Sequence, residues 1–287
     1  MIVLGILLAL AVGACKPKPD AAVEQPEIPD GTPAPTEVPA AVRVNGEGIP
    51  LADFEAEMQR YQAGMSELGE TVDPEIAQQT VLDYLTSQVL LAQAAAVQGY
   101  QPQDGEIQAV YDGLVEDVGG NDALNLWISQ NYFSDESFRR ALAQDLAAVW
   151  MRNKILADVP KTADQIHARQ ILVKSENEAI AVERQLQVGK DFTALAFEYD
   201  SLTGGDLGWF PSGYLLQPDV ENAAFALQPG QFSGVIPTSY GYHLVFVIER
   251  DAQHPLSPEA LLSIQRRVFE KWLNDRIAQS TIEVLVP

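Results

Sequence analysis

Apolar residues recur every three to four positions through most of the chain between residues 50 and 157, a period that predicts amphipathic helices. Asp73, Pro74 and Glu75 form the strongest helix start, because they supply a capping acid, a proline at the first helical position and a second acid beside the positive end of the helix dipole. We expect helices over about 50–63, 73–97, 104–117, 121–130 and 134–157.

The pattern changes after Pro160. Residues 165–173 are strand-like, and a capping box at 175–178 starts a helix that runs to about residue 188. A short helix over 191–199, several turns marked by glycine and proline, and an apolar strand over 242–249 follow. This order indicates a compact α+β domain of roughly 90 residues.

The two ends of the folded part complement each other. Residues 41–44 form a short strand closed by the turn dipeptide at 45–46, and this strand has no sheet partner nearby. After a helix over 257–278, residues 282–286 supply the missing strand. The predicted fold class is therefore α+β: a mainly helical domain (41–160) completed by the C-terminal helix and strand (256–287), with the second domain (161–255) inserted between them.

The start of the chain suggests an export signal. Residues 2–12 are continuously apolar, too short to span a bilayer but suited to a signal-peptide core. Val12, Gly13 and Ala14 then precede Cys15 and resemble a bacterial lipobox, although no basic residue comes first and valine replaces the commoner leucine. The alternative is a chance apolar start with a buried thiol. We expect a lipoprotein signal peptide over 1–15, a lipid on Cys15, and an extracytoplasmic protein anchored to a membrane.

Residues 16–40 contain seven prolines and no aromatic residue, which is typical of an extended spacer.

The formal net charge of the chain is −22, which argues against a protein that binds nucleic acid through phosphate. Counted by segment, −13 of it falls on residues 41–160. That excess predicts either a solvated surface or a surface that favours basic client segments.

The chemistry of catalysis is restricted by composition. One cysteine excludes an internal disulfide framework, and three histidines leave little material for a zinc site, so we expect no metal and no cofactor. The sequence also lacks the motifs of nucleophilic serine hydrolases, P-loops and dinucleotide-binding folds.

Three motifs in the second domain are specific: GGDLGWF at 204–210, AAFALQPG at 223–230 and TSYGYH at 238–243. They closely resemble the three signatures of parvulin-type peptidyl-prolyl cis-trans isomerases, and the resemblance extends over about 164–251. Residues 44–47 and the helix after them are similar to the start of the extracytoplasmic foldase chaperones typified by SurA and PrsA. The resemblance implies an inserted parvulin domain, a small antiparallel sheet with helices, in a SurA-like chaperone.

Rotation about an X–Pro bond crosses a barrier of about 18–20 kcal/mol and needs no covalent step, only an apolar socket for the ring and polar groups around the twisted imide. Matching positions to the family implies catalytic roles for Gln170, Asp200, Thr238 and His243. The implied substrate-binding residues are Leu207, Phe210, Leu215, Val220 and Phe225. The expected partners are unfolded secreted or envelope polypeptides that contain proline.

The match has three departures. Gln170 stands where the family usually has histidine, and His167 points to the other face of the strand. The loop before Gly204 is shorter than usual, and residues 213–225 carry one extra residue, with Val220 in place of a common phenylalanine. The alternative function is therefore a parvulin-fold holdase with little or no catalysis. His243 could also be a satisfied core residue, and His254 is expected in a loop.

Overall fold

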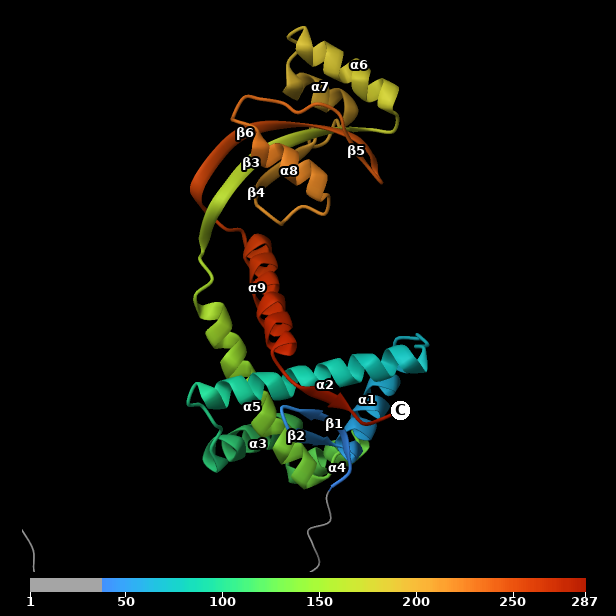
Figure 1. The fold of residues 1–287 in the computed structure, drawn as a ribbon, viewed down its shortest axis with the longest axis vertical. Coiled ribbons are helices and arrows are strands. Elements are labelled where there is room, and N and C mark those ends of the chain that lie inside the picture. Colours follow the sequence, from blue (N-terminus) through green and yellow to red (C-terminus); the bar gives the residue numbers. More distant parts are fainter. Residues whose placement is uncertain (1–37) are drawn as a thin grey trace, which may run out of the picture. The chain divides into compact units, whose positions relative to one another are not determined.

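The two ends of the described chain meet in one small sheet. The structure is a computed structural model that describes residues 38–287. Strands β1 (Ala40–Val44), β2 (Glu47–Pro50) and β7 (Ile282–Val284) form an antiparallel sheet in the order β2-β1-β7 (Figure 1). Val42 pairs with Val284, across almost the whole length of the sequence. The predicted domain built from both chain ends is confirmed.

Helices complete this domain: α1 (Leu51–Glu67), α2 (Pro74–Val97), α3 (Asp104–Val118), α4 (Asn121–Gln130), α5 (Asp135–Ala157) and α9 (Pro258–Ala278). The predicted start of α2 is observed, because the side chain of Asp73 accepts a hydrogen bond from the Glu75 amide at 2.8 Å. One apolar cluster joins the small sheet to α1 and α2, and a second joins α2, α5 and α9. The C-terminal helix is thus part of the core of the N-terminal domain.

Residues 162–255 form the inserted domain around a second antiparallel sheet in the order β4-β3-β6-β5. Its strands are β3 (Thr162–Val173), β4 (Asp206–Pro211), β5 (Ile236–Thr238) and β6 (Gly241–Pro255). Its helices are α6 (Glu176–Gln187), α7 (Phe192–Tyr199) and α8 (Pro218–Ala226). The α+β fold class, with a mainly helical domain and an inserted domain of small antiparallel sheet and helices, is confirmed.

The two faces of this sheet bury different clusters. Ile171 and Leu244 pack with α6 and α7, whereas Ala168 and Val245 pack with α8 (Figure 1). Side chains alternate between faces along a strand, so Gln170 shares the face of Ala168. The site described below lies on that face.

The helix expected from about residue 50 is confirmed, because Pro50 is the N-cap of α1. The turn expected at Asn45 and Gly46 is confirmed as well, with positive φ values of 54° and 87°, and it leads into strand β2. One local prediction was wrong. His254 was expected in a loop but lies on β6, which pairs with β3 as far as Pro255. The buried Gln165 supports this extension, because its amide donates to the carbonyl oxygen of His254 at 2.7 Å.

The predicted signal peptide, the predicted lipidation site Cys15 and the part of the predicted spacer up to residue 37 lie outside the described residues. Within residues 38–287, no helix is both long enough and apolar enough to cross a membrane.

Candidate functional site

Sheet register brings together the side chains at the centre of the site. Gln170 on β3 pairs with Val245 on β6, and His243 lies two residues before Val245 on the same face. Strand β5 then pairs with the start of β6, which places Thr238 across the hairpin from Gly241. Gln170 therefore meets Thr238 and His243, which are close to each other in sequence but far from Gln170, at one end of the sheet.

These three side chains form a continuous hydrogen-bonded chain. The imidazole Nδ1 of His243 lies 2.9 Å from Oε1 of Gln170, and its Nε2 lies 2.9 Å from the hydroxyl oxygen of Thr238. An amide oxygen can only accept, so Nδ1 carries the proton and Nε2 accepts from the Thr238 hydroxyl. The amide of Tyr240 donates to the same hydroxyl oxygen at 3.1 Å, which holds Thr238 in place.

The chain of hydrogen bonds is electrically neutral. His243 is only 2% exposed, and this burial lowers the pKa of its imidazole below the usual 6.5. Gln170 has no titratable proton. The site can therefore offer oriented dipoles near neutral pH, but it contains no charged acid or base among these three residues.

Asp200 has a different role in the structure. Its carboxylate accepts hydrogen bonds from the amides of Leu202 at 3.0 Å, Thr203 at 3.2 Å and Gly205 at 3.2 Å, and from the Thr203 hydroxyl. Its bond with the Thr203 hydroxyl, followed by those with the backbone amides, lowers the pKa of Asp200 to about 2. Asp200 makes no hydrogen bond to the other three predicted catalytic residues.

The turn that Asp200 holds nevertheless touches the site. The amide of Gln170 donates to the carbonyl oxygen of Gly205 at 2.8 Å. A Cβ atom on Gly205 would lie 1.9 Å from the carbonyl oxygen of Gln170, so only glycine fits this approach. Asp200 is thus connected to the site through backbone geometry.

The five predicted substrate-binding residues belong to one apolar cluster, which also contains Val245. Phe210 and Val220 are buried inside it, at 0% and 2% exposure. Leu207, Leu215 and Phe225 are partly exposed at its edge. The surface available to a ligand is formed by the partly exposed members, and contact of Val220 with substrate stays a prediction.

Sequence reasoning missed Glu221. This glutamate on α8 is 5% exposed, and its carboxylate accepts hydrogen bonds from the amides of Gly213, Tyr214 and Leu215, the last two at 2.8 Å. It therefore fixes the loop that carries Leu215. The available signal was an acid beside Val220, a position that the motif match had placed in the socket.

The other two histidines, His167 and His254, contact residues other than those of the His243 network. Nε2 of His167 lies 2.8 Å from a carboxylate oxygen of Asp206, and the rings of His254 and Trp209 stack with centroids 3.9 Å apart. Asp206 also accepts from the Gly208 amide at 2.9 Å, so it stabilises its own turn. Over residues 38–287, no group of three or more His, Cys, Asp or Glu residues could hold a metal ion.

Comparison with known proteins agrees with this architecture. The family described as PPIC-type PPIASE domain matches residues 143–261, and the SurA-like N-terminal domain family matches residues 33–142. The fold and site thus define a parvulin-type domain carried by a SurA-like chaperone domain.

Two relatives and one solved structure are similar to this chain, and the first relative, at 31% identity over 70% of its own length, shows the family. The foldase protein PrsA of Geobacillus sp. is 31% identical over 200 residues, which cover 65% of this chain and 70% of the relative. PrsA of Caldanaerobacter subterraneus is 32% identical over 60% of this chain and 56% of its own length. A crystal structure of the peptidylprolyl isomerase PrsA from Bacillus cereus is 21% identical, covers 84% of this chain and 86% of its own, and has a TM-score of 0.45. The chain belongs to the PrsA foldase family.

Proposed function

We propose that this foldase accelerates cis-trans isomerisation of X–Pro bonds in unfolded secreted or envelope proteins. The observation that carries the proposal is the neutral chain Gln170–His243–Thr238 beside the partly exposed apolar residues Leu207, Leu215 and Phe225. Val245, which pairs with Gln170 and belongs to that cluster, connects the two parts.

The mechanism is non-covalent. A prolyl imide loses amide resonance as it twists, which leaves a more basic nitrogen and a ketone-like carbonyl. The apolar edge would hold the proline ring while the neutral dipoles bind the twisted imide better than either planar form. No bond of the substrate breaks, and no proton has to be transferred. Glutamine in place of histidine at residue 170 is compatible with this mechanism, because it still donates and accepts hydrogen bonds.

A second candidate function is a holdase that binds unfolded chains without turnover. The burial of His243 favours it, because both ring nitrogens are already bonded to protein groups and the ring is 2% exposed. In that case the Gln170 network stabilises the fold of the inserted domain.

A protease-coupled isomerisation assay separates the two functions. The wild-type protein should accelerate the slow phase well above the buffer rate, and Leu215→Ala should reduce the effect because it removes part of the socket edge. Val284→Ala, a change in the other sheet of the molecule, is the matched control and should leave the rate unchanged. If only Gln170→His is active, the natural protein is a holdase.

We also propose that the chain is tethered by a lipid on Cys15 and works outside the cytoplasm. The support is the apolar run at 2–12, the lipobox-like residues before Cys15 and the proline-rich spacer after it. Radiolabelled fatty acid should be incorporated into the wild-type protein and not into Cys15→Ser. Equal labelling of both would contradict the tether.

A further inference from the structure

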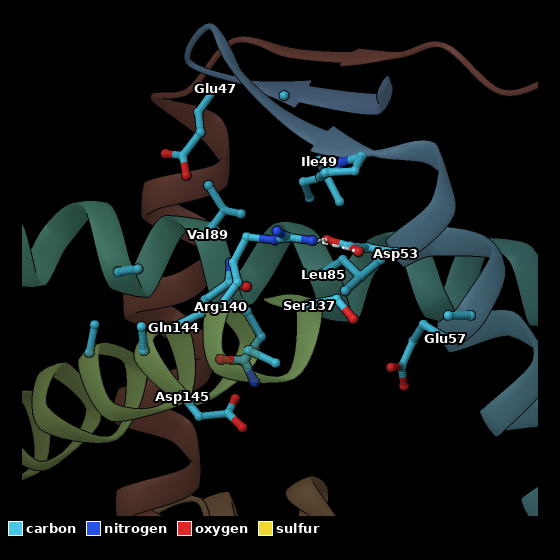
Figure 2. Close-up of a pocket in the computed structure, with 18 of the residues that line it drawn as sticks. Glu47, Ile49, Asp53, Glu57, Leu85, Val89, Ser137, Arg140, Gln144 and Asp145 are labelled. Atoms are coloured by element: carbon cyan, nitrogen blue, oxygen red, sulfur yellow. Dashed lines mark hydrogen bonds and ion pairs between the residues drawn. The ribbon is translucent and has the colours of Figure 1, made fainter. Parts of the chain in front are cut away.

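A groove in the helical domain is held together by its own charged side chains. Helices α1, α2 and α5 and strand β2 enclose about 1040 Å³, and Arg140 of α5 donates to the carboxylate of Asp53 on α1 at 2.8 Å (Figure 2). Arg60 donates to Glu57, which lines the same groove, at 2.9 Å. These four side chains are engaged with one another. The inserted domain, by contrast, exposes an apolar side chain beside the candidate site.

That side chain, Leu172 of β3, lies on the face of the sheet that carries the site. Leu172 pairs with His243 in the antiparallel register, and residues opposite each other on neighbouring strands point to the same face. Gln170, two positions earlier on β3, shares this face. Strand β4 pairs with β3 only over residues 165–169, so within the described chain this edge of β3 is open beside Leu172.

The surface changes character along β3. Ala168 is 0% exposed and belongs to the apolar cluster that contains the socket edge. Gln170 follows with its bond to His243, and Leu172 comes next, at 37% exposure. A single exposed leucine is common on protein surfaces and says little by itself. Its place here, directly beyond the polar network, is what gives it significance.

The start of β6 holds Leu172 in place. A Cβ atom on Gly241 would lie 3.0 Å from Cδ1 of Leu172 and 2.4 Å from the carbonyl oxygen of Val173, so the backbone of the hairpin approaches this leucine closely. The ammonium group of Lys174 donates to the carbonyl oxygen of Tyr240 at 3.4 Å and connects the hairpin to the end of β3. Leu172 is thus presented by two paired strands.

The order of groups on this face matches the order of groups in an X–Pro unit. In the substrate the proline ring, the imide and the α-carbon of the preceding residue follow one another, with the imide in the middle. On β3 the apolar cluster at Ala168, the polar network at Gln170 and the side chain of Leu172 follow in the same order, about 7 Å apart. With the ring at the socket edge and the imide at the network, the preceding side chain falls beside Leu172.

We infer that Leu172 is a specificity-determining residue, which contacts the side chain that precedes the proline and favours an apolar residue there. The inference rests on the proposed isomerase function, because it names the client sequence that the same site selects. Leu172 has no part in twisting the imide. It selects which X–Pro bonds are bound, whereas Gln170, His243 and Thr238 act on the bond itself.

The test uses the full-length protein and four capped peptides of the form Ala-X-Pro-Phe, in which X is leucine, glutamine, glutamate or lysine. Exchange NMR measures the catalysed rate for each peptide without a protease whose own specificity would enter. The wild-type protein should act on the leucine peptide with a kcat/KM about fivefold above that for the glutamine peptide, as expected when a leucine side chain is partly buried. Equal values would overturn the inference.

A matched pair of variants localises the preference. Leu172→Ala should reduce the leucine-to-glutamine ratio to about twofold or less and leave the glutamine peptide nearly unaffected, because only the apolar contact is removed. Val188→Ala changes an apolar residue that is 85% exposed at the end of α6, and it should keep the wild-type ratio. A preference that survives in Leu172→Ala would show that another residue selects the client.

A third variant reverses the selection. Leu172→Lys should raise the ratio of kcat/KM for the glutamate peptide to that for the lysine peptide about two- to fivefold above the wild-type ratio, the size of an exposed charge pair. The ratio cancels any general effect of the substitution on folding or turnover. An unchanged ratio would mean that Leu172 does not face the residue before the proline.

The same samples separate this inference from the proposed function. If the peptides bind, as seen from their chemical shifts, but show no catalysed exchange, the isomerase function fails and the preference is read from the Kd values instead. Equal Kd values for the leucine and glutamine peptides would then overturn the role of Leu172 as well. Equal catalysed exchange of all four peptides would leave the isomerase function intact and refute the role of Leu172 alone.

Discussion

His243 is the residue on which the candidate site is centred, and its environment determines what chemistry is open to it. A buried imidazole with a lowered pKa remains neutral where an exposed histidine would begin to bind protons. Its partners Gln170 and Thr238 are neutral as well. These three residues can therefore bind a ligand through oriented dipoles and shape complementarity, and not through a charged group.

The lowered pKa of His243 predicts a specific dependence of stability on pH. The unfolded chain binds a proton on this histidine near pH 6.5, and the folded protein does so only at lower pH. The unfolded state thus holds more protons between the two pKa values, so stability is full above about pH 6.5 and falls as the pH decreases through that interval. Urea unfolding at pH 7.5 and 5.0 should show a smaller loss for His243→Asn than for the wild type. Equal losses would contradict the assigned burial.

Glu221 is the second residue with a strong prediction. Its buried carboxylate satisfies three backbone amides of the loop that carries Leu215. Glu221→Ala leaves those donors unpaired and should lower the free energy of unfolding by about 2–4 kcal/mol. Asp219→Asn, an exposed acid of the same helix, is the control and should have a small effect.

Hydrogen exchange checks where the Glu221 effect arises. The amides of residues 213–215 should exchange faster in Glu221→Ala than in Asp219→Asn. Unchanged protection there would show that the carboxylate does not hold the loop.

At the scale of elements, the turn between α7 and β4 is fitted to the backbone of β3. Gly205 and Gly208 both have positive φ values, 66° and 67°. Only Gly205 approaches another segment, because a Cβ there would lie 1.9 Å from the carbonyl oxygen of Gln170, whereas a Cβ on Gly208 meets nothing within 4 Å. Alanine at Gly208 would therefore introduce backbone strain alone, whereas alanine at Gly205 would introduce the same strain and a steric clash with Gln170.

Gly208→Ala should cost about 1–2 kcal/mol, the strain of its backbone conformation. Gly205→Ala carries the same strain and must also displace β3, so its cost should exceed that of Gly208→Ala by roughly 2 kcal/mol or more. Thermal unfolding of the two variants measures the difference. Equal destabilisation would contradict the close approach to Gln170.

Elements with strong periodicity or caps were predictable from the sequence. Asp73 and Pro74 fix the start of α2, and the capping side chain of Ser175 accepts from the Glu178 amide at 3.3 Å. By contrast, β4, α8 and β5 are short, and their positions depend on contacts made after folding. Glu221 shows why, since its bonds to residues 213–215 exist only once α8 lies beside that loop.

The sequence motifs predicted which residues belong to the candidate site, but they did not predict how those residues are arranged. Gln170, Thr238 and His243 lie together, as the motif match implied, but Asp200 bonds to its own turn instead. Burial of Val220 could not be read from the motifs, because it depends on how α8 packs over the sheet.

At the scale of the whole molecule, the inserted domain interrupts a domain that only the C-terminal segment completes. The amide of Asn45 donates to the carbonyl oxygen of Thr281 at 2.8 Å, and the amide of Thr281 donates to Oδ1 of Asn45 at 3.0 Å. Strand β7 continues this contact along β1. The end of the chain therefore belongs to the same core as its start.

Removal of residues 281–287 should destabilise the helical domain selectively, because β1 loses its β7 partner and Ile282 leaves the core cluster of that domain. Calorimetry should show one transition moved to lower temperature and a second, from residues 162–255, unchanged. A single transition that shifts as a whole would mean that the two domains unfold together.

Exchange NMR on a short proline peptide tests the central claim most directly, because it observes the cis and trans forms at equilibrium without a coupling protease. Uncatalysed interconversion takes tens of seconds, too slow for cross-peaks at sub-second mixing times. Catalytic amounts of the wild-type protein should produce such cross-peaks, and Leu215→Ala should weaken them. Peptide shifts that report binding without any exchange cross-peaks would contradict isomerase activity and leave the protein a holdase.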